Sequence, residues 1–262
     1  MFTHAPLLDL GSGPTLLFLH GIGMRAAAYR PLLDLLSRHA RVIAPDLPGA
    51  GWAPLPDGPL TLDRFADAVQ AMLDARGIRP AAIVGHSLGG GVALSLAARG
   101  TPPRSLILID SVGPGVQTSP ANLLARFFLL KTLRVILTPS RWPAVWRVLP
   151  HFLATTAFRF RKMVRLGGFA IRAARERHPA LSGSIPPPVF VTAVDDELFP
   201  PALYRDCAAG LRGSRVVEVA GGHDWCLLRP VLAARVVLAA WREAESGEEV
   251  LQGTSGMGPK HA

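Results

Sequence analysis

The chain has 262 residues, of which 49% are hydrophobic and 18% are charged, with 26 glycines and 24 prolines. This length and composition exclude an intrinsically disordered chain and predict a globular protein of one or two domains. No apolar run reaches about 18 residues without a charge, so no spanning helix is expected, and no signal-peptide pattern is evident. Two cysteines, Cys207 and Cys226, are too few for a disulfide framework and suit a reducing, cytoplasmic compartment.

The formal net charge of +9 is concentrated in one segment. Residues 111–185 contain ten arginines, two lysines and one acid, Glu176, so this segment carries +11 and the rest of the chain −2. It also holds eight of the 18 aromatic residues. The segment therefore has to be interpreted separately from the remainder of the chain.

Short apolar runs alternate with helical patterns on both sides of this basic segment. Before it, residues 15–20, 40–45, 81–85 and 105–110 are predicted strands, residues 7–10 an edge strand, and residues 31–39, 61–76 and 89–99 helices. After it, residues 188–194 and 215–220 are predicted strands, and residues 202–211 and 229–243 helices. Thr61 and Gly77 are placed to cap the helix 61–76. The alternation predicts an α/β fold, with helices on both faces of a mostly parallel sheet.

The expected organisation is a core in two parts, residues 1–112 and 186–242, separated by a helical insertion, residues 113–185. The insertion is entered through Gly113-Pro114-Gly115 and left through Ile185-Pro186-Pro187-Pro188, and no convincing strand pattern occurs in it. Residues 243–262 are acidic and rich in glycine and serine, and we expect a disordered tail there.

The strongest functional motif is Gly85-His86-Ser87-Leu88-Gly89, which lies between a predicted strand and a predicted helix. In this context the G-x-S-x-G pattern forms a strained turn that exposes a serine nucleophile. Flanking glycines are needed because side chains there would collide with the neighbouring strand and helix. The following helix points its N–H groups at the reacting centre. A purely structural glycine-rich turn is the alternative interpretation.

A serine nucleophile needs a base and an acid that orients the base. Asp195, Asp196 and Glu197 follow the predicted strand 188–194, and His223 follows the predicted strand 215–220. Because the carboxyl ends of parallel strands meet at one edge of a sheet, we expect these groups near Ser87. This reasoning alone leaves the three acids as alternatives.

Four stretches together resemble the α/β-hydrolase superfamily across roughly residues 7–242: Leu17-Phe18-Leu19-His20-Gly21, Pro45-Asp46-Leu47-Pro48-Gly49, Gly85-His86-Ser87-Leu88-Gly89-Gly90 and Gly222-His223. The resemblance implies an α/β-hydrolase fold in which the insertion forms a helical cap. It also implies Ser87 as nucleophile, His223 as general base and Asp196 as the acid. Asp196 is selected because the acid of the family precedes a proline by four residues, as Asp196 precedes Pro200.

The resemblance further implies an oxyanion hole formed by the backbone N–H groups of Ile22 and Leu88, with Gly23 as the alternative to Ile22. His20 is expected to brace this loop, and His86 to be structural. No cofactor is implied. No metal-ligand spacing occurs, because Cys-x-x-Cys and His-Glu-x-x-His are absent from the sequence.

The activity implied is that of a serine hydrolase, which cleaves carboxylic esters of small or lipid-like apolar substrates through an acyl-enzyme. Trp52 and the aromatic insertion indicate an apolar entrance. Lactones, thioesters, carbon–carbon bonds and acyl transfer remain open, because the same triad serves them all. A ligand-binding protein that scarcely turns over is the alternative from a different functional class.

The insertion is amphipathic at residues 160–175, where Gly167-Gly168 indicates a hinge or a break. Basic residues on one side are Arg161, Lys162, Arg165, Arg172 and Arg175, and apolar residues on the other are Phe160, Met163, Val164 and Ile171. This surface could be merely solvated, could dock on an anionic membrane, or could guide a soluble anionic substrate. Nucleic-acid binding is not expected, because no recognised motif accompanies the charge.

Overall fold

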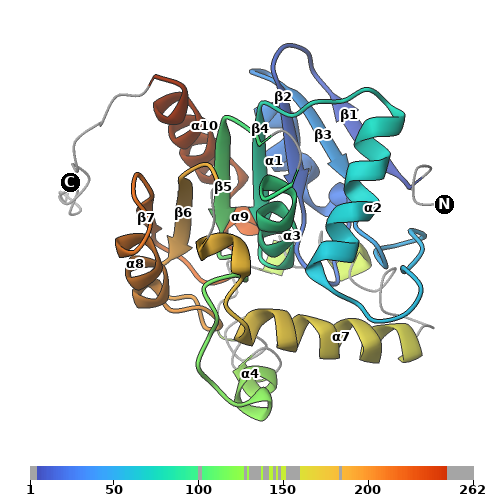
Figure 1. The fold of residues 1–262 in the computed structure, drawn as a ribbon, viewed down its shortest axis with the longest axis vertical. Coiled ribbons are helices and arrows are strands. Elements are labelled where there is room, and N and C mark those ends of the chain that lie inside the picture. The colour runs from blue at the N-terminus through green and yellow to red at the C-terminus, as the bar shows by residue number, and fades with distance from the viewer. Residues whose placement is uncertain are drawn as a thin grey trace.

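The computed structural model describes residues 5–99, 102–126, 160–182 and 185–246, with a few isolated positions between 129 and 151. Seven strands form one sheet in the order β1-β3-β2-β4-β5-β6-β7 (Figure 1). The strands are β1 (Leu7–Leu10), β2 (Thr15–Leu19), β3 (Arg41–Pro45), β4 (Ala82–His86), β5 (Ser105–Ile109), β6 (Pro188–Ala193) and β7 (Arg215–Val219). β1 pairs antiparallel with β3, and all other pairs are parallel. The predicted α/β class and mostly parallel sheet are confirmed.

Two layers of helices cover the sheet. One face carries α2 (Leu62–Ala75), α3 (Leu88–Ala97) and α8 (Pro201–Ala209), and the other carries α1 (Arg30–Leu36), α9 (Trp225–Leu228) and α10 (Pro230–Ser246). Each face of the sheet has its own hydrophobic core, and successive strand residues pack into opposite cores. In β2, Leu17 and Leu19 pack on the first face, and Leu16 and Phe18 pack on the second. Burial on both faces explains why the strands are continuous apolar runs.

The ends of two helices test local sequence signals. At α2, Thr61 Oγ1 accepts a hydrogen bond from the N–H of Arg64 over 3.2 Å, and Gly77 has a φ of +63° just past the helix. Both predicted caps are therefore present. Helix α10 continues to Ser246, beyond the predicted end of the helix, and residues 247–262 lie outside the described residues.

The chain leaves the sheet between β5 and β6, which nevertheless pair in parallel. The described helices of this insertion are α4 (Pro120–Ala125), α7 (Phe160–Arg175) and the 3₁₀ turn η5 (Pro179–Ser182). Figure 1 shows α4 and α7 below the sheet, apart from its two helical layers. Several basic and aromatic residues of the insertion lie outside the described residues: Phe127, Phe128, Lys131, Arg134, Arg141, Arg147, Phe152, Phe158 and Arg159.

Helix α7 is continuous, so Gly167-Gly168 does not break it. Of the predicted apolar side, Val164 is 56% exposed, whereas Ile171 packs against the core, and the side chains of Phe160 and Met163 lie outside the described part of the chain. The helix also buries Leu166, Phe169 and Ala173, and the ring centroid of Phe169 lies 4.9 Å from that of Phe65 on α2. These three residues follow the spacing i, i+3, i+7 and form a second apolar stripe. Within the described part of the chain, no helix has the length and apolar character to span a membrane.

Candidate active site

The turn after β4 holds Ser87 in a strained conformation, with a φ of 53° and a ψ of −120°. Such values are uncommon for any residue other than glycine and are found at functional sites. The glycines around it are sterically required. A Cβ atom on Gly85 would lie 2.5 Å from the carbonyl oxygen of Gly89, and one on Gly89 would lie 2.2 Å from that of Leu19. The close packing of α3 on β2 and β4 therefore requires glycine at both positions.

A chain of hydrogen bonds runs from Ser87 to the loop after β6. His223 Nε2 lies 3.0 Å from Ser87 Oγ, and His223 Nδ1 lies 2.9 Å from Asp196 Oδ2. The other oxygen of Asp196 accepts from the N–H groups of Leu198 (2.7 Å) and Phe199 (3.0 Å). Burial alone would raise the pKa of Asp196, but His223 and the two N–H groups lower it below its ordinary value. The arrangement can therefore orient His223 and stabilise its protonated form.

The three acids of the loop have different surroundings. Asp196 is buried and contacts the imidazole of His223. Glu197 Oε2 accepts from the backbone N–H of His223 over 3.3 Å, whereas Asp195 is exposed and its backbone N–H donates to the carbonyl of Gly221. The structure thus places Asp196, rather than Asp195 or Glu197, against the histidine ring.

Two backbone N–H groups beside Ser87 are suited to an oxyanion. Leu88 begins α3, and both Leu88 and Ile22 line the same cavity as Ser87, while Gly23 does not. The loop before Ile22 packs directly on the serine, since a Cβ on Gly21 would lie 3.2 Å from Ser87 Cβ. Among the hydrogen bonds of the described residues, none uses the N–H of Ile22 or of Leu88. Both donors thus remain able to bind a developing negative charge.

Two other histidines hold the surrounding loops in place. His20 Nδ1 donates to the carbonyl of Gly21 (2.8 Å), and its Nε2 accepts from the N–H of Leu47 (2.9 Å). Burial lowers the pKa of His20, in keeping with a neutral ring that accepts at one nitrogen. His86 lies on the side of the elbow away from the cavity, where its Nδ1 is 2.6 Å from the hydroxyl of Tyr29.

Asp110 was missed by sequence reasoning, although it too directly follows a strand, β5. It is fully buried, and its two oxygens accept from the N–H of Ala193 and from Trp225 Nε1, each over 2.8 Å. Burial raises the pKa of Asp110 well above its ordinary value, and the nearby Asp196 raises it further. The sequence could have indicated it, because Asp110 ends a predicted strand and so lies at the same edge of the sheet as Ser87.

Asp110, Asp196 and His223 have potential ligand atoms within 4.8 Å of one another, the spacing of a metal site. However, Asp196 and His223 bond each other, and the remaining oxygens accept from N–H groups. These hydrogen bonds already engage the atoms that a metal ion would need as ligands.

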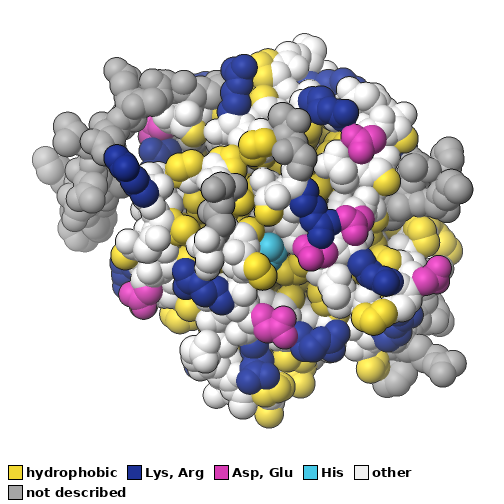
Figure 2. Space-filling view, viewed as in Figure 1, with side chains coloured by type: hydrophobic (Ala, Val, Ile, Leu, Met, Phe, Trp, Pro, Cys, Tyr) yellow, Lys and Arg dark blue, Asp and Glu magenta, His cyan; other side chains and the backbone are white. Residues whose placement is uncertain are grey.

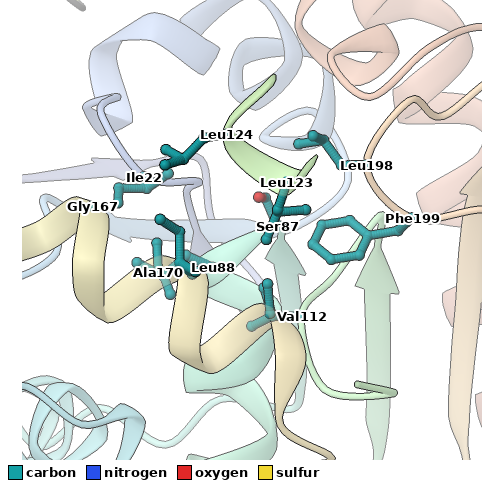
Figure 3. A pocket seen from close by; sticks show the side chains of 12 residues that line it. Ile22, Ser87, Leu88, Val112, Leu123, Leu124, Gly167, Ala170, Leu198 and Phe199 are labelled. Atoms are coloured by element: carbon teal, nitrogen blue, oxygen red, sulfur yellow. The ribbon is translucent and has the colours of Figure 1, made fainter. Parts of the chain in front are cut away.

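An apolar cavity of about 120 Å³ opens at Ser87 (Figure 3). Among the described residues that line it, the serine is the one polar residue, and its hydroxyl oxygen lies beside Leu123 in Figure 3. The insertion provides much of the wall, with Leu123 and Leu124 from α4 and Gly167, Ala170, Ile171 and Ala174 from α7. Trp52 is exposed and does not line this cavity, and its place at the entrance stays a prediction.

Comparisons with known proteins give related hydrolases. A 2-hydroxymuconate semialdehyde hydrolase of Pseudomonas is 39% identical over 112 residues, which is 41% of this chain and 40% of that protein. The solved structure of a meta-cleavage product hydrolase from Pseudomonas fluorescens superposes with a TM-score of 0.73 at 20% identity, covering 92% of this chain and 94% of the other. At that identity the likeness shows the fold alone.

The chain spans less than half the length of the first curated relatives. An uncharacterized protein of Mycobacterium tuberculosis is 31% identical over 154 residues, which is 56% of this chain and 45% of that protein. The model of one family, described as the alpha/beta hydrolase family, matches residues 16–236, from the second residue of β2 through β7 and into α10. The protein therefore belongs to the alpha/beta hydrolase family.

Proposed function

We propose that the protein is a serine hydrolase that cleaves carboxylic esters with a small apolar acyl or alcohol group. The observation that carries this proposal is the hydrogen-bonded series Ser87–His223–Asp196, with distances of 3.0 and 2.9 Å, at the base of an apolar cavity. The arrangement has the nucleophile, base and orienting acid that acyl transfer requires.

The proposed reaction has two halves. His223 Nε2 takes the proton of Ser87 Oγ as this oxygen attacks the ester carbonyl, and the N–H groups of Ile22 and Leu88 stabilise the oxyanion. His223 then returns the proton to the leaving alcohol, which leaves an acyl-enzyme. In the second half, His223 removes a proton from water, and the resulting attack releases the acid and restores Ser87. Asp196 stays ionised and holds the imidazole throughout.

The cavity limits the size of the apolar group. An engineered cavity of about 150 Å³ admits benzene, so a cavity of about 120 Å³ fits a short acyl chain or a small ring. Long lipid chains would extend beyond it. A p-nitrophenyl ester series from acetyl to palmitoyl, with Ser87→Ala as blank, is therefore expected to show an optimum at about four to six carbons. Activity that persists in Ser87→Ala would contradict the serine mechanism.

Hydrolysis of a carbon–carbon bond is the second candidate, because the related proteins named above are hydrolases of meta-cleavage products and of 2-hydroxymuconate semialdehyde. Among the described residues, the lining of the cavity is apolar apart from Ser87, which supports an ester with an apolar group as the first candidate. Hydrolysis of lactones and thioesters is tested with Ser87→Ala as the blank. Acyl transfer is tested by adding alcohols and measuring how the product divides between ester and acid. Slow single turnover with tight binding would indicate a ligand-binding protein instead.

We further propose that the outer side of α7 contacts anionic membrane surfaces. Val164, Arg165, Arg172 and Arg175 are exposed there, and in the described part of the chain no carboxylate forms an ion pair with these arginines. Figure 2 shows cationic and apolar side chains side by side at the lower end of the molecule, where α4 and α7 lie. Cations next to apolar side chains suit an anionic lipid surface. Two buried free cysteines support a reducing compartment such as the cytoplasm.

Vesicle sedimentation separates this proposal from a solvated surface or a funnel for soluble anions. Stronger sedimentation with anionic than with neutral vesicles at low salt is expected, and loss of it in Arg165→Glu/Arg172→Glu. Arg235→Glu, on the exposed side of α10, is the matched control. Equal sedimentation with both kinds of vesicle would contradict membrane contact.

A further inference from the structure

The mechanism above uses one buried carboxylate, but the site contains two. Asp110 is completely buried, and one of its oxygens lies within 4.8 Å of an oxygen of Asp196 and of a ring nitrogen of His223. Its φ of +40° lies in the left-handed region that favours glycine. A strained, fully buried aspartate so near the acid of a triad requires an explanation.

The contacts of Asp110 connect the two loops that carry the acid and the base. One oxygen accepts from the N–H of Ala193, at the end of β6 just before the loop of Asp196. The other accepts from Trp225 Nε1, two residues after His223. Asp110 therefore fixes the positions of both loops relative to β5, whose Ile109 carbonyl accepts from the backbone N–H of Ser87.

The charges at this place do not balance if both carboxyl groups are ionised. Among the described residues, no lysine or arginine pairs with Asp110 or Asp196, and His223 is the one partner able to become cationic. Two carboxylates at this separation in a buried site cannot both ionise at neutral pH, so the pair retains a proton. The hydrogen bonds decide where it lies: Asp196 bonds the imidazole and two N–H groups of its own loop, which favours the anion there.

We propose that Asp110 is a positioning residue that stays protonated during the reaction and shares its proton with the Asp196 carboxylate. The pair then carries a single negative charge, located on the acid that contacts His223. A second negative charge would stabilise the protonated imidazole of His223. The rise of the reaction rate on the acid side of its pH profile would then occur at higher pH. A neutral Asp110 keeps His223 available as a base at lower pH. This inference rests on the proposed triad.

The proton can be observed without any substrate. Carbon-13 NMR of protein labelled at the aspartate carboxyl carbons is expected to show one protonated carboxyl group at neutral pH, absent from Asp110→Asn. Since the wild-type spectrum alone is informative, the test does not depend on the variant folding. A wild-type spectrum in which every aspartate is ionised at neutral pH would overturn the proposal.

The pH profile tests the consequence for His223. Inactivation by diisopropyl fluorophosphate reports the reactivity of Ser87 even if no ester is turned over, so failure of the ester hypothesis is distinguishable from failure of this inference. Asn replaces a neutral carboxyl by a neutral amide. In Asp110→Asn, the acid side of the pH profile of inactivation is therefore expected at the wild-type pH, and the rate of inactivation is expected to fall less than about tenfold.

A matched variant shows what removal of a carboxylate does. Glu197→Gln removes the carboxyl group that accepts from the backbone N–H of His223, and it is expected to move the acid side of the pH profile to lower pH. A downward move of about one pH unit or more in Asp110→Asn would mean that Asp110 is ionised. A loss in Asp110→Asn as large as that in Asp196→Asn would mean that Asp110 is itself the acid of the triad. Either result overturns the proposal.

Discussion

His86 Nε2 donates a hydrogen bond to the backbone carbonyl of His223 over 3.1 Å, so the histidine next to Ser87 in the chain supports the histidine that we propose as its base. The chain of contacts continues on the other side of the ring, where Tyr29 donates to His86 Nδ1 and accepts from the N–H of Gly21. The buried side chains of Tyr29 and His86 thereby join the loop of Gly21 to the loop of His223.

Removal of the Tyr29 hydroxyl should weaken this connection. Tyr29→Phe leaves the N–H of Gly21 and the Nδ1 of His86 without their partner in a buried site, at a cost of about 1–3 kcal/mol in the free energy of unfolding. We expect kcat to fall by less than about a hundredfold, since no reacting group is lost. Urea unfolding and ester kinetics measure both quantities. An unchanged unfolding midpoint would show that the network is not needed.

Substitutions in the proposed triad should have steep and unequal effects. Ser87→Ala and His223→Ala are expected to reduce the rate by several orders of magnitude. Asp196→Asn should cost far more than Asp195→Asn, because Asp196 contacts the imidazole and Asp195 is exposed. Circular dichroism checks that each variant is folded. Equal losses in the two aspartate variants, or the reverse order, would contradict the assignment of the acid.

The raised pKa of Asp110 predicts a pH dependence of stability. Above the ordinary aspartate value of 3.8 the unfolded chain has lost this proton, while the folded protein, through burial and then the proximity of Asp196, retains it. The folded state binds more protons, so this group lowers the free energy of unfolding as pH rises from 3.8 towards the raised pKa, by at most about 1.4 kcal/mol per unit.

Urea unfolding of wild type and Asp110→Asn over this pH range isolates the contribution, since other groups cancel in the difference. The stability of wild type relative to Asp110→Asn should fall with rising pH. Asp196 acts in the opposite direction, because its lowered pKa adds stability that is lost as pH falls through that value. A pH-independent difference would show that Asp110 titrates normally.

The adjacent glycines of α7 provide a matched pair for the size of the cavity. Gly167 lines the cavity and a Cβ there would have no atom within 4 Å, whereas Gly168 does not line it and a Cβ there would meet only Arg172, at 3.8 Å. Gly167→Leu should shift the chain-length optimum to shorter esters, and Gly168→Leu should leave it unchanged. The same shift of the chain-length optimum in both variants would mean that leucine disturbs the helix rather than fills the cavity.

The same pair predicts a gain in stability. Glycine inside a helix costs roughly 0.5–1 kcal/mol relative to alanine. Gly167→Ala and Gly168→Ala should therefore each raise the unfolding free energy by about that amount, because neither alanine meets a close neighbour. Thermal unfolding measures this gain, and a loss in either variant would indicate that the helix needs glycine at that position.

Much of the architecture could be predicted because its causes are local. Strands buried on both faces are recognisable as apolar runs, and the turn at Ser87 needs glycines that the sequence displays. Tyr29 could not be found this way, because it lies just before α1 and meets His86, 57 residues later at the end of β4, only in the folded chain. The buried side of α7 was predicted only in part, at Ile171, because two apolar arcs compete on that helix and tertiary packing on Phe65 selects the one with Phe169.

The pairing of β5 with β6 across the insertion also sets the order of events during synthesis. Ser87 enters the growing chain 136 residues before His223. Until the last two strands leave the ribosome and join the sheet, Ser87 has neither the proposed base nor the proposed acid beside it, and its hydroxyl is expected to be as unreactive as that of any serine. The long connection adds little thermodynamic cost, because each doubling of a loop costs only about 0.6 kcal/mol. With the proposed triad, the topology would therefore place Ser87 beside its base and acid only after the core has been translated.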